Sequence, residues 1–152
     1  MAVKLDTVVP FGRSFDEYVK MFGLTETELQ QPILSVADGP ASFNAEGTRL
    51  GYRIRSVDPL YCFDAAQIKQ RFDAVVDNII NQVENSLDDW VWSYHHSPGG
   101  LRKNREAAIE LFCQDFEQGR AAGRYAVGEL PQLNYPDTAY RLGLCSHFLF
   151  LY

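Results

Sequence analysis

The sequence predicts an α/β fold, in which helices flank a parallel sheet, on three observations. Short apolar runs such as residues 33–37 (ILSVA) are typical of strands buried on both faces. Residues 64–92 carry apolar side chains at steps of three and four, which is the spacing of an amphipathic helix. Segments of these two kinds alternate along the chain, which implies right-handed crossovers within a parallel, doubly wound sheet.

The composition bounds the class of protein. The length of 152 residues suits a single compact domain. The formal net charge of −6 argues against a general nucleic-acid binder, because neutralising phosphates requires clustered Lys and Arg. Residues 1–22 show no secretion signal, and no apolar run is long enough for a membrane helix. The cysteines Cys62, Cys113 and Cys145 are odd in number and far apart, so we expect buried, reduced thiols in a cytoplasmic protein.

An N-terminal helical segment is expected over residues 1–32. Ser14 and Glu17 form the capping-box pattern S-x-x-E. This pattern predicts a helix over residues 15–22 that ends at Gly23.

Four strands and three more helices are expected to follow, in the order strand, helix, strand, two helices, strand, loop, strand. The expected strands are residues 33–37, 52–57, 124–128 and 141–147. The expected helices are residues 43–50, 64–92 and 101–119, the last inside an inserted helical region at 93–120. Ser42 is expected to cap the first of these helices.

In parallel sheets of this kind, ligands bind beyond the carboxyl ends of the strands. The strand at 33–37 is followed by small residues, Gly39 among them, which let the backbone approach a ligand closely. The next strand ends at Asp58, 19 positions after Gly39, and a carboxylate at that spacing can accept hydrogen bonds from vicinal ribose hydroxyls. Each feature alone also fits a plain turn or loop cap. Together they predict a nucleoside-binding site.

Two stretches resemble class I S-adenosylmethionine-dependent methyltransferases. Residues 33–43 (ILSVADGPASF) are similar to the family's first motif, V-L-D-x-G-x-G-x-G-x-F. Residues 128–150 (GELPQLNYPDTAYRLGLCSHFLF) resemble its later stretch, G-D-A-x-x-L-P-F-P-D-x-S-F-D-x-V. The resemblance implies a Rossmann-like sheet with strand order 3-2-1-4 and S-adenosylmethionine as cofactor. It places cofactor contacts at Ala37, Asp38, Gly39, Pro40, Asp58, Glu129, Leu130 and Ser146.

The resemblance also implies a role for several of these residues. Asp58 would bind the ribose, Glu129 would lie near the adenine amino group, and Leu130 would pack on the adenine ring. Ser146, or His147 beside it, would lie at the end of the fourth strand and face the methyl-transfer cleft.

The chain departs from the family pattern in its first motif. Ser35 stands where the family has Asp or Glu, and Ala37 and Ala41 replace two glycines. Asp38 is expected to take over the contact with the methionine ammonium group. Tyr18, on the first helix, is expected either to close over the cofactor or to pack in the core.

The implied reaction is direct displacement at the sulfonium methyl, in which the protein holds nucleophile, methyl and sulfur in line. No residue is identified as a catalytic base. The expected partners are S-adenosylmethionine, S-adenosylhomocysteine and a methyl acceptor that is a small molecule or a protein.

The family's sheet continues for three more strands, whereas this chain ends in an apolar run, residues 148–152 (FLFLY). We therefore expect an incomplete cofactor-binding domain. Its fourth strand or tail would pair with a second copy in a homodimer, or the domain would continue in a longer chain.

Two other functions are kept open. A nicotinamide- or flavin-dependent oxidoreductase needs G-x-G-x-x-G, where this chain has Gly39, Ala41 and Asn44. A non-catalytic scaffold that keeps the methyltransferase fold is favoured by Ser35, Ala37 and the early end of the chain.

Structural roles are expected for the remaining conspicuous side chains. His95 and His96 are adjacent, point different ways and lack a third ligand, so no metal site is expected. His147 is expected to be a core or edge histidine rather than a base. Trp90 and Trp92 are expected to lie in the core.

Overall fold

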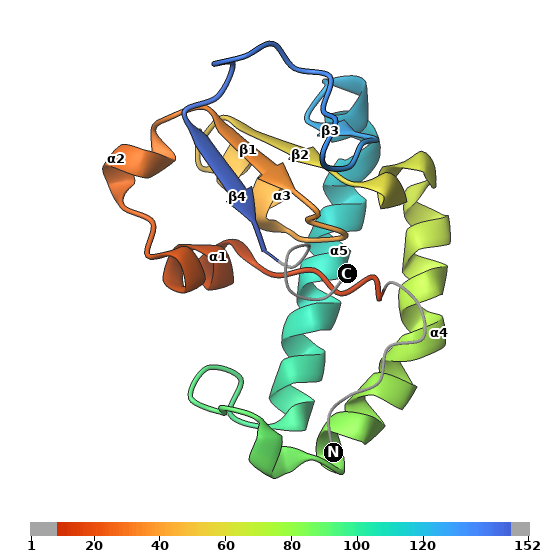
Figure 1. Cartoon of the computed structure of the whole chain (residues 1–152). Helices are drawn as coiled ribbons and strands as arrows, with labels where there is room; N and C mark the ends of the chain where they lie inside the picture. Colours follow the sequence, from red (N-terminus) through yellow and green to blue (C-terminus); the bar gives the residue numbers. More distant parts are fainter. Residues whose placement is uncertain (1–8, 147–152) are drawn as a thin grey trace.

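A four-stranded sheet forms the centre of the protein (Figure 1). The computed structural model describes residues 9–146. The strands are β1 (Ile33–Val36), β2 (Ile54–Val57), β3 (Tyr125–Ala126) and β4 (Leu142–Cys145). All neighbouring pairs are parallel and the order is β3-β2-β1-β4, so the predicted α/β class, parallel sheet and strand order are confirmed.

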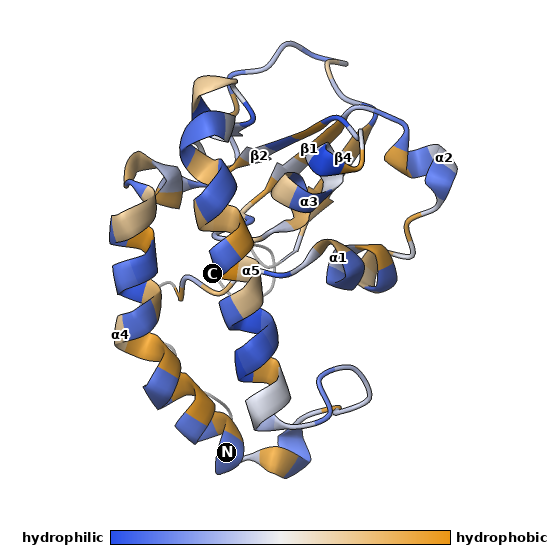
Figure 2. Ribbon diagram, turned by 180° about the vertical axis from the view of Figure 1, so that it is seen from behind, coloured by the Kyte–Doolittle hydropathy of each residue, from blue (hydrophilic) through white to orange (hydrophobic). Residues whose placement is uncertain are grey.

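The helices are α1 (Phe15–Phe22), α2 (Glu26–Leu29), α3 (Phe43–Arg49), α4 (Ala65–Glu84) and α5 (Pro98–Ala121), with short 3-10 turns at Pro59–Cys62 and Leu87–Asp89. Of these, α3 and α5 lie against one face of the sheet, and α4 packs on α5 (Figures 1 and 2). Ile33, Ile54 and Leu144 point to the helix-covered face and are buried, whereas Arg55 and Gly143 on the opposite face are exposed. A doubly wound arrangement with helices on both faces is therefore not what residues 9–146 form.

The first helix begins and ends as the sequence predicts. The Ser14 hydroxyl accepts from the Glu17 backbone N–H, and the Glu17 carboxylate accepts from the Ser14 N–H. Gly23 ends the helix in the left-handed conformation, with φ of 61°. Ser42 behaves differently, because it makes no side-chain capping hydrogen bond to α3 and instead donates to the Glu46 carboxylate.

The single long helix expected over residues 64–92 is wrong, because α4 ends at Glu84. The Ser86 hydroxyl donates to the Gln82 carbonyl, so it competes with the next helical turn. Beyond this point the apolar spacing continues without a core to fill, since Leu87 is 46% exposed and Val91 81% exposed.

Only one of the two tryptophans at this end of α4 reaches the core. Trp90 is exposed, which contradicts its expected burial, and it stacks on Trp92 with ring centroids 5.9 Å apart. Trp92 is half-buried against the helical core.

The third strand is shorter than expected, because only Tyr125 and Ala126 pair with β2. The chain then crosses the helix-free face, where Gly128 lies against Val57: a Cβ at residue 128 would be 2.8 Å from Val57 Cγ1. This close approach requires glycine.

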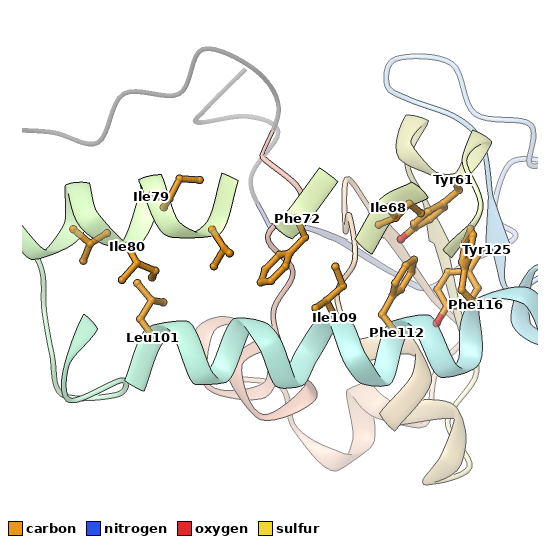
Figure 3. Close-up of a cluster of buried hydrophobic side chains, with 12 residues drawn as sticks. Tyr61, Ile68, Phe72, Ile79, Ile80, Leu101, Ile109, Phe112, Phe116 and Tyr125 are labelled. Carbon is orange, nitrogen blue, oxygen red and sulfur yellow. The ribbon is translucent and has the colours of Figure 1, made fainter. Parts of the chain in front are cut away.

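Aromatic and aliphatic side chains between α4 and α5 form the larger core cluster (Figure 3). Phe112 is fully buried, and its ring centroid lies 4.8 Å from that of Phe116 and 5.5 Å from that of Tyr125. Tyr61 stacks on Phe112 at 5.9 Å. This cluster joins the helical hairpin to the end of β2 and to β3.

A smaller core cluster fills the space between α1, α3 and the sheet. Tyr18 is 1% exposed, and its ring centroid lies 4.4 Å from that of Phe43. Ile33 and Ile54 of neighbouring strands complete the contact with the sheet. This cluster seats α1 at the carboxyl ends of the strands.

Two expectations from composition can be compared with residues 9–146. None of the described helices combines the length and apolarity needed to cross a membrane. The three cysteines are free thiols, but Cys62 is exposed rather than buried, while Cys113 and Cys145 are half-buried.

Replacing Phe112 by Ala should lower the free energy of unfolding by about 3–5 kcal/mol, because it removes a fully buried ring and leaves a cavity. Urea denaturation followed by circular dichroism measures this loss. The control is Val91→Ala at the 81% exposed site, which should change the free energy by less than about 0.5 kcal/mol. Equal effects of the two substitutions would contradict the assigned core.

Candidate functional site

The carboxyl ends of β1, β2 and β4 meet at the edge of the sheet beside α1 (Figure 1). The order of connection reverses between β1 and β4, and in open α/β sheets the crevice at such a reversal is the usual ligand site. The predicted residues that follow β1, β2 and β4 all lie at this edge: Ala37, Asp38, Gly39, Pro40, Asp58 and Ser146.

The loop after β1 has an unusual backbone. Ala37 has φ of 61°, a left-handed conformation that costs a side-chain-bearing residue about 1–2 kcal/mol. Gly39 is also left-handed, with φ of 54°, and a Cβ there would have no heavy atom of residues 9–146 within 4 Å. Within the described part of the chain, no side chain covers the backbone at Gly39.

Gly12, which precedes this loop by more than one helix in the sequence, packs closely against it. A Cβ at Gly12 would lie 2.2 Å from the Ala41 nitrogen, so only glycine fits there. The Ser42 N–H donates to the Arg13 carbonyl and fixes the two segments together. The sequence analysis missed Gly12, because no local pattern marks a contact between residues so far apart.

Asp58 contacts the loop directly. Its Oδ2 accepts a hydrogen bond from the Gly39 N–H at 2.8 Å, and its Oδ1 accepts from the Leu60 N–H at 2.7 Å. Burial raises the pKa of Asp58, and the charges of Asp38 and Glu129 raise it further, against the lowering effect of the two backbone hydrogen bonds. The glycine turn and the acid at the strand end thus form one structural unit.

The peptide of Gly39 is held from both sides. Its N–H donates to Asp58, and its carbonyl accepts from the Tyr61 hydroxyl at 2.8 Å. Tyr61 is itself 1% exposed within the larger core cluster. The loop conformation is therefore set by the core and not by a ligand.

Asp38 is buried, and its carboxylate accepts hydrogen bonds from three hydroxyl groups. Its Oδ1 accepts from Tyr18 at 2.7 Å and from Ser35, and its Oδ2 accepts from Ser56 at 2.7 Å. Asp38 is 4% exposed, and burial raises its pKa although the three hydroxyls oppose the shift. Three hydroxyl groups thus occupy most of the acceptor sites of this carboxylate, which lies out of contact with solvent.

Tyr18 both packs in the core and reaches the site. Its hydroxyl oxygen lies 3.3 Å from the hydroxyl of Ser146, the first residue after β4, while it donates to Asp38. A chain of hydroxyls and one carboxylate therefore joins α1 to the ends of β1, β2 and β4. His147 lies outside the described residues.

Glu129 and Leu130 lie in the loop after β3. Glu129 forms an isolated bridge with Gln132, and its charge contributes to the raised pKa of Asp58. Leu130 is half-buried and precedes a cis peptide bond to Pro131. Neither residue is brought into a hydrogen bond with Asp58 or Gly39 among the contacts of the described residues.

An ion cluster behind α1 escaped the sequence analysis. Arg105 Nη1 lies 2.8 Å from both carboxylate oxygens of Glu17, and both side chains are nearly fully buried. His95 Nε2 lies 3.5 Å from the same carboxylate, and its Nδ1 contacts the Asn104 side chain at 2.8 Å. Burial lowers the pKa of His95. Glu17 was predicted only as a capping residue, because Arg105 is 88 positions away along the chain.

Comparison with known proteins gives one similar chain. The sequence is 34% identical over 148 residues to an uncharacterized protein, MJ0045, of Methanocaldococcus jannaschii. The match covers 97% of this chain and 66% of that protein, so the chain spans just under two thirds of the relative's length. No protein-family model matches the chain, and no solved structure matches it. Function must therefore be argued from the site itself.

Asp38→Asn should change the pH dependence of stability with a definite sign. Because burial raises the pKa of Asp38, the folded protein keeps this proton to a higher pH than the unfolded chain does. The contribution of Asp38 to stability therefore falls as pH rises from its ordinary value to the raised folded value. Relative to wild type, the Asn variant should become more stable as pH rises above the ordinary carboxyl pKa of about 4, measured by urea denaturation.

The matched control is Asp115→Asn, for which the opposite sign is expected. Burial tends to raise the pKa of Asp115, but hydrogen bonds from Arg124 and Tyr125 lower it overall. Wild type should therefore gain stability over this variant as pH rises. If both variants change in the same direction, the raised pKa of Asp38 is not supported.

Proposed function

We propose that this chain is the cofactor-binding part of a class I, Rossmann-like methyltransferase, and that it binds S-adenosylmethionine at the carboxyl edge of the sheet. The observation that carries the proposal is the contact between Gly39 and Asp58, which joins a bare-backbone turn to a carboxylate on the neighbouring strand end. A nucleoside with vicinal hydroxyls requires both features. Gly39 allows the ligand to approach the backbone closely, and Asp58 can accept hydrogen bonds from the ribose.

The backbone of the loop supports the same proposal. Ala37 stands where the resembled motif has glycine, and it keeps the left-handed conformation that glycine adopts without strain. Strain at a residue that bears a side chain is concentrated at functional sites. The acid that the motif carries at the position of Ser35 also has a counterpart, since the Asp38 carboxylate accepts a hydrogen bond from the Ser35 hydroxyl.

The predicted site residues can be assigned to different parts of the cofactor. Each Asp58 carboxylate oxygen accepts one backbone hydrogen bond and retains a second lone pair for a ribose hydroxyl. Glu129 and Leu130 would accompany the adenine, as the resemblance implies. Ser146, at the point where the strand order reverses, would face the sulfur end of the cofactor. We assign Asp38 to holding the loop rather than to direct contact, because it is 4% exposed and accepts hydrogen bonds from three internal hydroxyl groups.

When bound, the cofactor supplies an electrophilic methyl group on a sulfonium. The work of the chain is then positioning, because displacement at a methyl group needs in-line geometry more than it needs an acid or a base. The loop is suited to this work, since Asp58 and Tyr61 hold the Gly39 peptide from both sides before any ligand arrives. We propose a small molecule or a protein as acceptor.

A second candidate function is a non-catalytic binding protein on the same fold. It is favoured by the burial of Asp38, which is 4% exposed and accepts hydrogen bonds from three internal hydroxyl groups. An oxidoreductase is the weakest alternative, because a dinucleotide site needs the glycines that Ala41 and Asn44 replace.

Thermal unfolding in the presence of S-adenosylmethionine, S-adenosylhomocysteine and NADH separates these functions. A ligand that binds only the folded state raises the unfolding temperature. A rise with the two sulfur nucleosides and not with NADH supports the proposal. A rise with NADH alone supports the oxidoreductase, and no rise with any ligand supports the scaffold and contradicts cofactor binding.

Gly39→Ala should weaken binding of S-adenosylhomocysteine by about tenfold or more, because the added methyl occupies the open space over the loop. Isothermal titration calorimetry measures the dissociation constant. The variant should remain folded, since left-handed Ala costs about 1–2 kcal/mol and its Cβ meets no other atom.

The matched control for this substitution is Gly23→Ala, at the end of α1. Gly23 has nearly the same φ, 61° against 54°, and a Cβ there also meets no atom of residues 9–146 within 4 Å. Both variants should therefore lose similar stability, while only Gly39→Ala loses affinity. Equal affinity in the two variants would place the ligand away from this loop.

A further inference from the structure

A hollow lies at the opposite, amino edge of the sheet, far along the strands from the loop that carries Gly39. Its volume is about 510 Å³, within the range of small-molecule sites. In Figure 1, the segment that joins β3 to β4 runs along this edge. Tyrosine and arginine side chains contribute much of the lining: Tyr52, Arg53, Arg55, Arg124, Tyr135 and Tyr140.

Arginines are the charged side chains that line the hollow in this negatively charged protein, and the lining Tyr52 hydroxyl donates to the Glu26 carboxylate at 2.8 Å. The chain has a net charge of −6, yet three arginines and no acidic residue line the hollow among residues 9–146. Arg124 is neutralised, because its guanidinium pairs with Asp115 at 2.6 Å. Arg53 donates to the Gln30 carbonyl, which brings no neutralising charge. Arg53 and Arg55 are both exposed, so their guanidinium groups remain accessible to an anion.

Arg55 lies on the helix-free face of the sheet, where the loop before β4 passes. Its Nη2 reaches to within 4.0 Å of where a Cβ of Gly123 would be. Its charge also acts on the Tyr140 hydroxyl. The arginine and the tyrosine thus face the same hollow from β2 and from the distant loop.

Two half-buried aromatic rings form the other wall. The rings of Tyr135 and Tyr140 meet edge to face, with centroids 5.2 Å apart and an interplanar angle of 87°. Aromatic side chains next to arginines are the usual means by which proteins hold an unstacked base and its phosphate. This lining is therefore suited to bind a ligand that has a planar ring and an anionic group.

We propose that this hollow binds a phosphorylated nucleoside, either free or as part of a single strand. Arg53 and Arg55 would contact the phosphate oxygens, because arginine forms charge-assisted, bidentate hydrogen bonds to phosphate. Tyr135 and Tyr140 would contact the base. The net charge of the whole chain argues against general nucleic-acid binding, whereas this patch concentrates positive charge at one place.

The proposal is independent of the one made for the carboxyl edge. The two sites lie at opposite ends of the parallel strands and share none of the residues named for them. Failure of cofactor binding would leave this inference standing, and its own failure would leave the cofactor site untouched.

Isothermal titration calorimetry with guanosine monophosphate, guanosine and a short oligouridylate tests the proposal. The monophosphate should bind, and guanosine should bind about tenfold more weakly or not at all, because it lacks the anion. Tighter binding of the oligouridylate than of the monophosphate would identify a strand as the source. Binding of neither phosphorylated ligand, or equal binding of guanosine, overturns the proposal.

The double variant Arg53→Gln with Arg55→Gln should weaken the phosphorylated ligands by about tenfold or more. Arg102→Gln is the matched control, since Arg102 is an exposed arginine on α5 paired with Asp77 and Glu106, away from the hollow. Excess S-adenosylhomocysteine should leave the affinity for guanosine monophosphate unchanged. Displacement by it, or equal effects of the two arginine variants, would overturn the assignment to this hollow.

Discussion

The carboxylate of Asp38 ties together the elements on which the rest of the structure depends. It accepts hydrogen bonds from Ser35 on β1, Ser56 on β2 and Tyr18 on α1. A charge taken out of water must be stabilised by hydrogen bonds, so these three elements cannot separate without leaving it unsatisfied. The position of the loop that begins with Ala37 is therefore fixed by its contacts with the core.

A second buried charge extends this constraint to the helical hairpin. Glu17 caps α1 and at the same time pairs with Arg105 of α5. Breaking such a pair leaves an uncompensated buried charge, which costs far more than the pair contributes when intact. The orientation of α1 over the strand ends is thus set by two buried carboxylates, those of Asp38 and Glu17. This orientation is what brings the Tyr18 hydroxyl to Ser146.

The sheet is covered unevenly, and this asymmetry separates two kinds of surface. On the helix-covered face, Ser35 and Ser56 lie within a sealed polar network. On the other face, Arg55 is exposed and the loop after β3 provides the local cover, with Gly128 against Val57. Hydrogen bonding makes the first surface rigid, whereas the second presents charged and aromatic groups to the solvent. The two proposed sites lie at opposite edges of this same sheet.

Local sequence patterns predicted correctly those features that are determined by neighbouring residues. The capping box at Ser14, the helix end at Gly23 and the buried strand at Ile33–Val36 are determined by neighbours within a few residues, and all were predictable. The meeting of Gly39 and Asp58 at one edge could be anticipated from spacing, because parallel strands place successive strand ends together, but their direct hydrogen bond was not predicted. Apolar periodicity wrongly extended the helix through residues 87–92. The spacing shows that apolar side chains would share one face of a helix, but it does not show whether another element covers that face.

Tertiary structure alone decided the features that depend on residues distant in sequence. The pairing of Glu17 with Arg105, the contact of Gly12 with Ala41 and the meeting of Arg55 with the loop before β4 have no local signature. The same holds for Asp38, whose sequence position suggested a ligand contact but whose carboxylate is occupied by hydroxyls from three elements. The physical reason is that a side chain's charge and chemistry belong to the sequence, whereas its partners are chosen by the packing of the whole chain.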